Sequence, residues 1–274
     1  MALLGRRVAV SIPDTVLEEK ESPRDRTAKV GLIARACAIY GVDVIEVYRD
    51  PNGDGEIEWI CKVLEYLETP QYLRKRIYPL DETLRFAGVL PPLRIPSHKP
   101  RIPFASVPVG EVREGVVNAD GTVDIGLETA PRLGGRAPAG KRVTVKISSV
   151  RPPLAEAVEK KDAGAYWGYD VEPKQPEQVF ADSRYAVKVA TSRLGTKLPE
   201  ALGRFRDALG RTDSVKLVFG SPSRGLFDIF GPDLTRRADL VVNLFPGQKV
   251  ETVRTEEAIF AGLGLLSLLS VEKA

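Results

Sequence analysis

The sequence is poor in the side chains that most often hold metals or disulfides, with one histidine, two cysteines and one methionine among 274 residues. A single histidine argues against a histidine-based zinc or haem site, and two cysteines provide no disulfide framework. Cys37 and Cys61 each fall on the apolar face of a predicted helix, which favours core packing over redox or metal chemistry. We therefore expect no metal. The scarcity of asparagine, glutamine and methionine beside 28% charged residues is typical of a thermophile.

The sequence also lacks a long apolar run. The longest nearly apolar stretch, 258–269, is flanked by charged residues and is shorter than the roughly 20 residues that a membrane-spanning helix requires. Its pattern predicts a buried helix. No charged segment followed by an apolar core and a small-residue cleavage site opens the chain, so we expect a cytoplasmic protein without a membrane partner.

Several motifs of common enzymes are missing. No G-x-G-x-x-G follows a predicted strand and no G-x-x-x-x-G-K-[ST] occurs, which disfavours the usual nucleotide-binding loops. The segment from Asp50 to Gly55 matches the first half of a calcium-binding loop, but Cys61 stands where that loop needs glutamate, so we interpret the segment as a polar turn. His98 lies in a proline-rich stretch and no G-x-S-x-G occurs, which disfavours a serine hydrolase.

The net charge is only +3, but it is unevenly distributed. Between Pro91 and Arg151 there are ten basic and five acidic residues, so this segment carries an excess of positive charge that the rest of the chain lacks. A basic segment that is also a structural unit favours contact with phosphate backbones. An ordinary solvated surface is the alternative interpretation.

The apolar periodicity divides the chain into three parts. Residues 1–90 alternate between strand patterns at 7–12 and 42–47 and helix patterns at 25–40 and 56–68, with Gly41 capping the first helix. Six prolines between Val89 and Pro108 mark a boundary. Period-two segments at 112–118, 122–127 and 143–147, the first two joined at Asp120-Gly121, then predict a small all-β module.

The alternation of strand and helix returns in the last third of the chain. We expect strands at 186–191, 215–219 and 239–244, a helix opened by Pro199, and the apolar helix described above. A helix-like charged run at 154–162 and a linker at Pro173 and Pro176 connect the two parts. The expected fold class is α/β, with one parallel-sheet domain built from residues 1–90 and 170–274 and interrupted by an all-β domain with its linkers at 91–169.

Three segments each follow a predicted strand of the last third: 191–195 (TSRLG), 220–226 (GSPSRGL) and 243–258, which begins NLFPGQ. The carboxyl ends of parallel strands meet at one edge of the sheet, and α/β sheets bind ligands there. Glycine and proline permit backbone geometries in which amides and carbonyls face a ligand. An ordinary strand-to-helix turn explains any one segment, whereas three on one edge predict a binding site.

At these three segments the sequence resembles the SPOUT class of RNA methyltransferases, whose C-terminal half forms a trefoil knot around S-adenosylmethionine. The resemblance extends to an archaeal and eukaryotic subgroup with an OB-like barrel inserted in the SPOUT domain, through the motifs at 11–15 (SIPDT), 26–29 (RTAK) with 33–36 (IARA), 72–75 (YLRK) and 88–93 (GVLPPL). It covers nearly the whole chain. A paired histidine of the subgroup is replaced here by Ser97-His98, so His98 receives no catalytic role.

The resemblance implies a set of site residues. Arg193, Arg254 and Glu257 would border the transferred methyl group. RNA contacts are expected at Arg26, Lys29 and Arg35 of the methyltransferase domain and at Arg132, Arg136, Lys141 and Arg142 of the insertion. S-adenosylmethionine would be bound, largely through backbone groups, at Thr191, Ser192, Gly220, Ser221, Gly225, Asn243, Leu244, Phe245, Pro246, Gly247, Gln248, Thr252 and Val253.

The activity implied by the resemblance is methylation of an RNA base, with uridine N3 of ribosomal RNA favoured. No histidine lies near the cofactor motif, so Glu257 or a water would accept the N3 proton and Arg193 or Arg254 would stabilise the oxyanion. Such enzymes work as homodimers, and we expect the apolar C-terminal helix at or near the interface. Two other classes stay open: a non-catalytic OB-containing RNA-binding or ribosome-assembly protein, and an unrelated α/β nucleotide-binding enzyme.

Overall fold

The computed structural model describes residues 5–17, 21–80 and 82–271. It divides into two compact units. Unit 1 comprises Met1–Leu67, Thr83–Leu93 and Tyr169–Ala274, and unit 2 comprises Glu68–Glu82 and Arg94–Gly168. Residues 68–82 therefore group with the middle of the chain, because Tyr72 donates a hydrogen bond to the carbonyl of Glu114 and Arg76 pairs with Asp124. The functional domains at 1–90 with 170–274 and at 91–169 stay predictions.

Unit 1 is built on a six-stranded sheet in the order β11-β9-β10-β1-β2-β8. Every neighbouring pair is parallel; Val10 of β1, for example, lies opposite Leu217 of β10 and Ile45 of β2. The central strands are buried on both faces, as a parallel sheet covered by helices requires. The predicted α/β fold with a parallel sheet is confirmed. The strands are β1 (Arg7–Pro13), β2 (Val44–Tyr48), β8 (Asp170–Lys174), β9 (Val187–Lys197), β10 (Ser214–Val218) and β11 (Leu240–Asn243).

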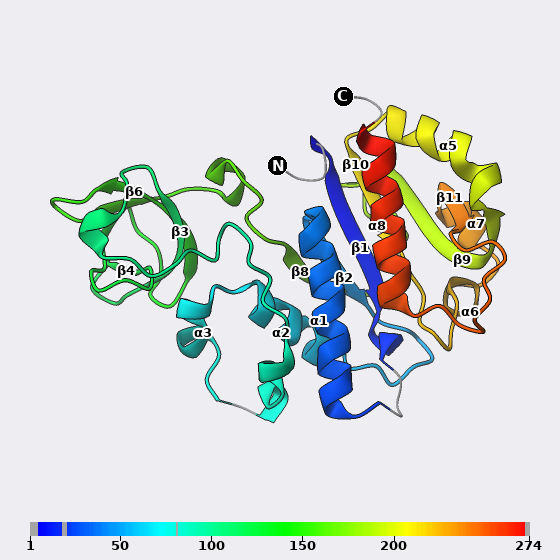
Figure 1. The fold of residues 1–274 in the computed structure, drawn as a ribbon, viewed down its shortest axis with the longest axis horizontal. Helices are drawn as coiled ribbons and strands as arrows, with labels where there is room; N and C mark the ends of the chain where they lie inside the picture. The colour runs from blue at the N-terminus through cyan, green and yellow to red at the C-terminus, as the bar shows by residue number, and fades with distance from the viewer. Residues whose placement is uncertain (1–4, 18–20, 81, 272–274) are drawn as a thin grey trace. The chain divides into compact units, whose positions relative to one another are not determined.

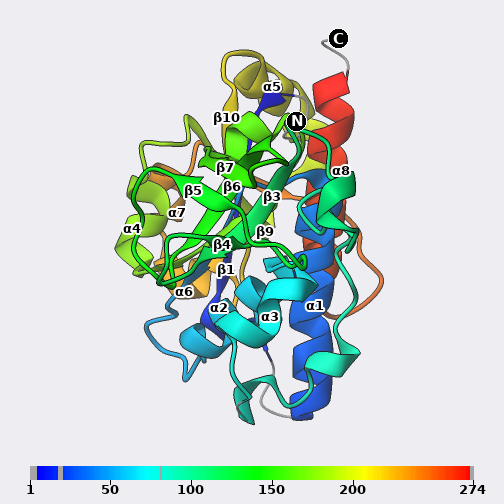
Figure 2. The ribbon, with the colours of Figure 1, turned by 90° about the vertical axis from the view of Figure 1, so that its left-hand side faces the viewer.

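Helices cover both faces of this sheet (Figures 1 and 2). α1 and α8 lie side by side on one face, and α4, α6 and α7 lie on the other. α1 begins where the Ser22 side chain accepts a hydrogen bond from the amide of Asp25, and it ends at Gly41 with φ of 68°, the cap that the sequence predicts. The helices are α1 (Pro23–Tyr40), α2 (Ile57–Glu68), α4 (Pro176–Ala181), α5 (Leu198–Gly210), α6 (Leu226–Phe230), α7 (Leu234–Arg237) and α8 (Thr255–Val271).

The apolar helix α8 is only partly buried. Ile259, Leu263, Leu266 and Leu269 form a stripe at helical spacing that is buried within unit 1, whereas Leu268 is 62% exposed. The buried helix that the sequence predicts is therefore confirmed, with one side left open. No helix in the described part of the chain combines the length and the apolar character that crossing a membrane requires.

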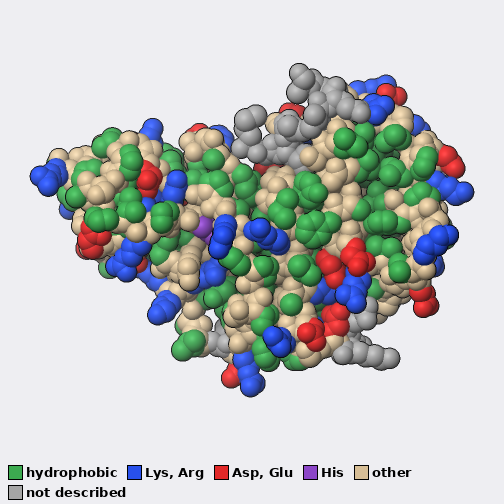
Figure 3. Space-filling model, viewed as in Figure 1, with side chains coloured by type: hydrophobic (Ala, Val, Ile, Leu, Met, Phe, Trp, Pro, Cys, Tyr) green, Lys and Arg blue, Asp and Glu red, His purple; other side chains and the backbone are tan. Residues whose placement is uncertain are grey.

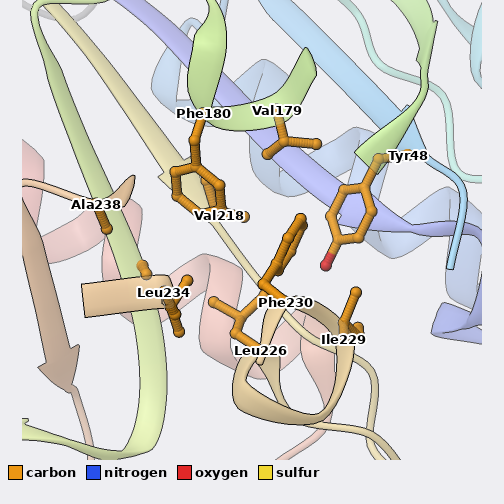
Figure 4. Packing of buried hydrophobic residues seen from close by; sticks show 10 residues of the cluster. Tyr48, Val179, Phe180, Val218, Leu226, Ile229, Phe230, Leu234 and Ala238 are labelled. Atoms are coloured by element: carbon orange, nitrogen blue, oxygen red, sulfur yellow. The ribbon is translucent and has the colours of Figure 1, made fainter. Parts of the chain in front are cut away.

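The opposite face of the sheet carries a second apolar cluster, shown in Figure 4. Tyr48 at the end of β2 packs against Phe230 of α6 with ring centroids 5.4 Å apart, and Phe180 of α4 meets Phe230 edge-on at 5.1 Å. Val218 of β10 and Leu226 of α6 belong to the same cluster. This packing fixes the start of α6, and therefore the loop that leads into it from β10.

Unit 2 is built on a five-stranded sheet in the order β4-β3-β6-β7-β5 (Figure 2). β3, β4, β6 and β7 pair antiparallel and β5 joins β7 in parallel, around a core that includes Val117, Val145 and Ile147. The sequence predicts a small all-β module in this part of the chain; the sheet is present, the unit also contains helix α3, and the OB-like character stays a prediction. The elements of this unit are α3 (Gln71–Ile77), β3 (Val112–Val117), β4 (Val123–Asp124), β5 (Arg132–Gly134), β6 (Arg142–Ser149) and β7 (Leu154–Ala157).

Two connecting segments differ from the sequence-based expectation. The run at 154–162, expected to be helix-like, forms strand β7 and a 3-10 helix at Lys160–Ala163, because Ala155 is a core residue paired with Leu133 and Ile147. Pro173, expected in a linker, lies in β8 at the edge of the parallel sheet, where a residue without an amide hydrogen is tolerated. Pro176, the other linker residue, opens α4.

Candidate functional site

A cavity of about 250 Å³ lies at the carboxyl ends of β9, β10 and β11. These three strands are neighbours in the sheet, so the segments that follow them meet at one edge, as the sequence predicts. The wall also includes Thr255 and Ala258 from the first turn of α8. Each of the three segments is held by its own hydrogen bonds.

The first segment, 191–195, belongs to β9 and is not the separate loop that the sequence suggests. The pairing of β11 with β9 jumps from Val241 opposite Ala190 to Val242 opposite Thr196, so the residues between them bulge out of the ladder. Gly195 makes this possible, because a Cβ atom there would lie 2.8 Å from the carbonyl group of Val241. The bulge turns Thr191 to Leu194 toward the cavity.

The second segment is a tight turn between β10 and α6. The amide of Ser221 donates to the carbonyl of Arg224 at 2.9 Å, and the amide of Arg224 donates to the hydroxyl of Ser221 at 3.0 Å. Gly220 opens the turn, since a Cβ atom there would lie 2.9 Å from the carbonyl oxygen of Arg224. The carboxylate of Asp228 accepts the amide hydrogen of Gly225 at 2.8 Å and closes the start of α6.

The third segment leads from β11 into α8. The Asn243 side chain accepts from the amide of Phe245 at 3.0 Å and donates to the carbonyl of Arg193 at 3.0 Å, which ties this segment to the bulge. Gln248 donates to the carbonyls of Val250 and Glu251, both at 3.1 Å. The two side-chain amides therefore hold their own loop and its neighbour in shape.

Most of the predicted cofactor residues meet at the cavity. Eleven of them line it: Thr191, Ser192, Gly220, Ser221, Gly225, Asn243, Leu244, Phe245, Gln248, Thr252 and Val253. Pro246 and Gly247 lie in the same loop but are not part of the wall. Six further wall residues lie within the three predicted segments without having been named as cofactor residues: Leu194, Pro222, Ser223, Glu251, Thr255 and Ala258. Three more lie outside the segments and were missed: Phe219, Phe227 and Asp228.

The three predicted catalytic residues are placed differently from one another. Arg193 is exposed and lines the cavity. Arg254 and Glu257 are exposed at the start of α8, outside the wall, and the Glu257 carboxylate accepts the amide hydrogen of Arg254 at 2.9 Å. That bond caps the helix, so Glu257 would have to release it to accept a proton from a substrate.

The predicted RNA contacts of unit 1 all have partners within the protein. Arg26 pairs with Glu56, and its guanidinium carbon lies 5.6 Å from the ring centroid of Trp59. Lys29 is buried and pairs with Glu21 at 3.1 Å. Arg35 donates to two carbonyls, those of Pro92 and Leu93. RNA contact by these side chains stays a prediction, and it would require phosphates to share or displace these partners.

The predicted RNA contacts of unit 2 fall into two groups. Arg132 on β5 and both Arg136 and Lys141 in the loop between β5 and β6 are exposed. Arg142 instead pairs with Glu68 at 2.6 Å and with Glu114 at 2.7 Å, and these carboxylates raise its pKa despite the opposing effect of burial.

The only histidine, His98, also lies in unit 2. Its Nε2 atom lies 2.9 Å from the carbonyl oxygen of Glu68, and burial lowers its pKa. His98 is thus part of the internal packing of unit 2, whereas the cavity belongs to unit 1.

The wall of the cavity combines groups of different chemistry. Phe219, Leu244 and Phe245 supply apolar surface, and Ser221 and Thr252 supply hydroxyls. Asp228 and Glu251 bring negative charge and Arg193 brings positive charge. Such a wall suits an amphipathic ligand that carries an apolar ring and charged groups. Within the described residues, no group of three or more histidine, cysteine, aspartate or glutamate side chains is arranged to hold a metal.

The chain is similar in sequence to known proteins over nearly its whole length. A 28S rRNA (uridine-N(3))-methyltransferase of Homo sapiens is 33% identical over 297 residues, covering 94% of this chain and 77% of its own, and an uncharacterized protein of Halobacterium salinarum is 35% identical over 288 residues, covering 95% and 98%. The crystal structure of a probable methyltransferase from Bordetella pertussis superposes with a TM-score of only 0.42 at 11% identity, covering 98% and 99%. The family model described as "Putative RNA methyltransferase" matches residues 7–266, nearly the whole chain, and the protein therefore belongs to this family of RNA methyltransferases.

Proposed function

We propose that the cavity binds S-adenosylmethionine and that the protein methylates N3 of a uridine in ribosomal RNA. The observation that carries the proposal is the meeting of three segments from neighbouring strands around one cavity, in a chain of the RNA methyltransferase family. The human relative, named for 28S rRNA and uridine N3, supports the choice of substrate.

The residues present fit this cofactor. Its adenine ring would lie against the apolar part of the wall, near Leu244, Phe245 and Ala258, where the Gly220 turn lets a ligand approach the backbone closely. The carboxylates of Asp228 and Glu251 suit the positive charge of the ammonium and sulfonium groups. When bound, the cofactor supplies an electrophilic methyl group.

The reaction requires the uridine N3 atom to face that methyl group in line, and N3 must lose its proton. Positioning therefore provides much of the acceleration. Arg193, at the wall, would stabilise the negative charge that develops on the uracil carbonyl oxygens. Arg254 is an alternative for this role. Glu257 or a water would accept the proton, and Glu257 can do so only after releasing the amide of Arg254.

Unit 2 would bind the RNA backbone. Arg132, Arg136 and Lys141 are exposed and close together in sequence, and phosphate contacts of this kind give affinity without reading the base sequence. None of the five aromatic side chains of this unit is exposed, so stacking on bases contributes little. These aromatic residues are Tyr72, Tyr78, Phe104, Tyr166 and Trp167. We also propose that unit 2 is an OB-like barrel and that the C-terminal part of unit 1 forms a knot.

The working unit in this proposal is a cytoplasmic homodimer. Leu32 and Ile39 of α1 lie seven residues apart, on one side of the helix, and are 45% and 54% exposed. Leu268 of the adjacent α8 is 62% exposed, and Figure 3 shows hydrophobic side chains gathered over these two helices. A second copy of the chain would cover this surface. The thermophilic source remains a sequence-based expectation.

Two measurements test the proposed function. Calorimetry should detect binding of S-adenosylmethionine or S-adenosylhomocysteine. Transfer of labelled methyl groups to total RNA from a strain without the gene, followed by nucleoside mapping, should yield 3-methyluridine. Labelling of another nucleoside would reject the proposed position but keep the methyltransferase. A folded protein that binds RNA but neither ligand at millimolar concentration would favour the non-catalytic RNA-binding protein instead.

A further inference from the structure

Asp50 is a buried carboxylate two residues beyond the end of β2, and its contacts reach three different segments. Its side chain accepts from the hydroxyl of Thr15 at 3.1 Å and from the amide of Asn52 at 3.1 Å, and it lies 3.3 Å from the guanidinium of Arg224. Because it is fully buried, this charge is tolerated only through these partners. The polar turn predicted at 50–55 is thus organised around Asp50.

Arg224 connects this carboxylate to the cavity. Its carbonyl and its amide are both bonded to Ser221, so the backbone of Arg224 closes the turn whose residues Gly220 to Gly225 form one side of the cavity. The Arg224 side chain is 25% exposed and is not itself part of the wall. A shift of Arg224 would therefore move the wall without removing any group that touches a ligand.

Two further hydrogen bonds, one of them to Asp50, connect the strand ends around this carboxylate. Asp14, which follows β1, accepts the amide hydrogen of Asp50 at 2.9 Å. The hydroxyl of Tyr48 donates to the carbonyl of Phe219 at 2.7 Å, which joins the end of β2 to the start of the turn. The carboxyl ends of β1, β2 and β10 are thus linked to one another by polar contacts beside the turn.

We propose that Asp50 is a positioning residue for methyl transfer, which holds Arg224 and thereby keeps the turn at 220–225 in the shape that binds the methyl donor. The inference rests on the proposed function, because it names a residue that acts on the donor site without lining it. Its role differs from that of a residue needed only for stability, since the donor affinity depends on the ion pair itself.

The test compares Asp50→Asn, Arg224→Gln and the double variant by calorimetry with S-adenosylhomocysteine and by kinetics with saturating RNA. Each single variant should raise Kd and the KM for S-adenosylmethionine about tenfold, the effect expected for loss of one charge-assisted contact. The kcat at saturating donor should stay within about twofold, because no group at the reacting atoms is altered. The double variant should be no worse than either single one. Arg224→Lys should restore part of the affinity.

Asp43→Asn is the matched control. Asp43 accepts the amide hydrogen of Val8 at 2.7 Å at the opposite end of β2, so its variant should lower the melting temperature and leave Kd unchanged. If Asp50→Asn does not fold, Arg224→Gln carries the test, because that side chain is partly exposed. Unchanged Kd in a folded Asp50→Asn or Arg224→Gln variant, or additive losses in the double variant, would overturn the inference alone. Failure of the unmodified protein to bind either ligand would overturn the proposed function as well.

Discussion

The ammonium group of Lys216 lies 2.8 Å from a carboxylate oxygen of Glu46, with neither side chain exposed. The two residues stand on β10 and β2, on either side of β1, and Ser11 of that central strand donates its hydroxyl hydrogen to Glu46 at 2.6 Å. Lys216 also donates to the carbonyl of Val179 at 2.9 Å. A polar cluster therefore crosses three strands in the middle of an otherwise apolar sheet.

Removing one partner of this pair should be costly. Lys216→Ala leaves the buried charge of Glu46 with only the more distant guanidinium of Arg184, at 3.6 Å, and we expect a loss of about 3 kcal/mol in the free energy of unfolding. The double replacement Lys216→Met with Glu46→Leu should recover most of that loss, because both members of the buried pair are removed and Asp182 keeps its pairing with Arg184. Urea unfolding measures both. Equal losses in the single and double variants would show that the hydrogen bonds of the cluster outweigh its charges.

The pH dependence of stability should include a contribution from Glu172. Hydrogen bonding from Arg184 holds the pKa of Glu172 at about 2, below its usual value of 4.5. A carboxyl whose pKa is lower in the folded state stabilises the fold above its unfolded pKa, and this contribution is lost as the pH falls from about 4.5 to about 2. Glu172→Gln should reduce the change of the urea midpoint with pH over that range. The control Glu177→Gln, an exposed carboxylate of α4, should leave the slope as it is.

Both thiols should be unreactive in the folded protein. Burial raises the pKa of Cys37, and burial together with the nearby Glu65 raises the pKa of Cys61 to about 12, so almost no thiolate exists at neutral pH. A chromogenic disulfide reagent should label neither thiol in buffer and both in urea. In Cys61→Ser, the remaining thiol of Cys37 should likewise be labelled in urea and not in buffer. Rapid labelling in buffer would contradict the interpretation of these residues as core hydrophobes.

RNA affinity should depend on where positive charge is removed. Replacing Arg132, Arg136 and Lys141 with alanine should weaken RNA binding and reduce the slope of log affinity against log salt by about two, because each phosphate contact contributes about 0.7 to 0.9. The matched control removes three exposed arginines from unit 1, at positions 204, 206 and 211, and should have little effect. Equal losses of RNA affinity in the two triple variants would show that the net charge of the protein, and not a binding surface on unit 2, determines the affinity.

The oligomeric state tests the exposed apolar surface of α1 and α8. Light scattering at micromolar concentration should give twice the 30.0 kDa mass of the chain. Leu268→Glu should shift the mass toward one chain, because it would place a charge in an apolar interface. Val109→Glu changes a comparably exposed side chain of unit 2 and should leave the dimer intact. A mass near 30 kDa for the unmodified protein would rule out the dimer.

Much of the fold could be predicted from periodicity, and the failures have identifiable causes. α1, with its glycine cap, and the apolar strands β1 and β10 follow simple patterns, whereas the start of α1 at Pro23, capped by Ser22, was placed two residues too late. β8 was not predicted, because Pro173 and its charged neighbours are typical of a linker in the sequence. The same residues are also tolerated in an edge strand, which is what they form. The short helices α6 and α7 span too few residues for a helical period to emerge.

The parts of the candidate site that depend on backbone geometry could be predicted from the sequence, and the parts that depend on packing could not. Gly220, which follows β10, and Asn243, which ends β11, are wall residues that the sequence pattern indicates directly. The bulge at 191–195 could not be recognised, since it exists only in relation to the register of β11. Asp50 was interpreted as part of a turn. The available signal for its contact with Arg224 was an aspartate two residues after a buried strand, at the same edge of the sheet as the glycine-rich segments.

The position of β10 between β9 and β1 has a consequence for how the chain is made. Arg7 of β1 lies opposite Ser214, so the N-terminal strand reaches its neighbour only after more than two hundred residues have been synthesised. During translation, β1 and β2 therefore stay without their other neighbours, β10 and β8, until these strands are synthesised. Unit 2 ends at Gly168, so all its residues are synthesised earlier and it can fold first. Pairing over such sequence separation is slow. Ribosome-bound nascent chains should therefore show unit 2 resistant to protease before unit 1 is.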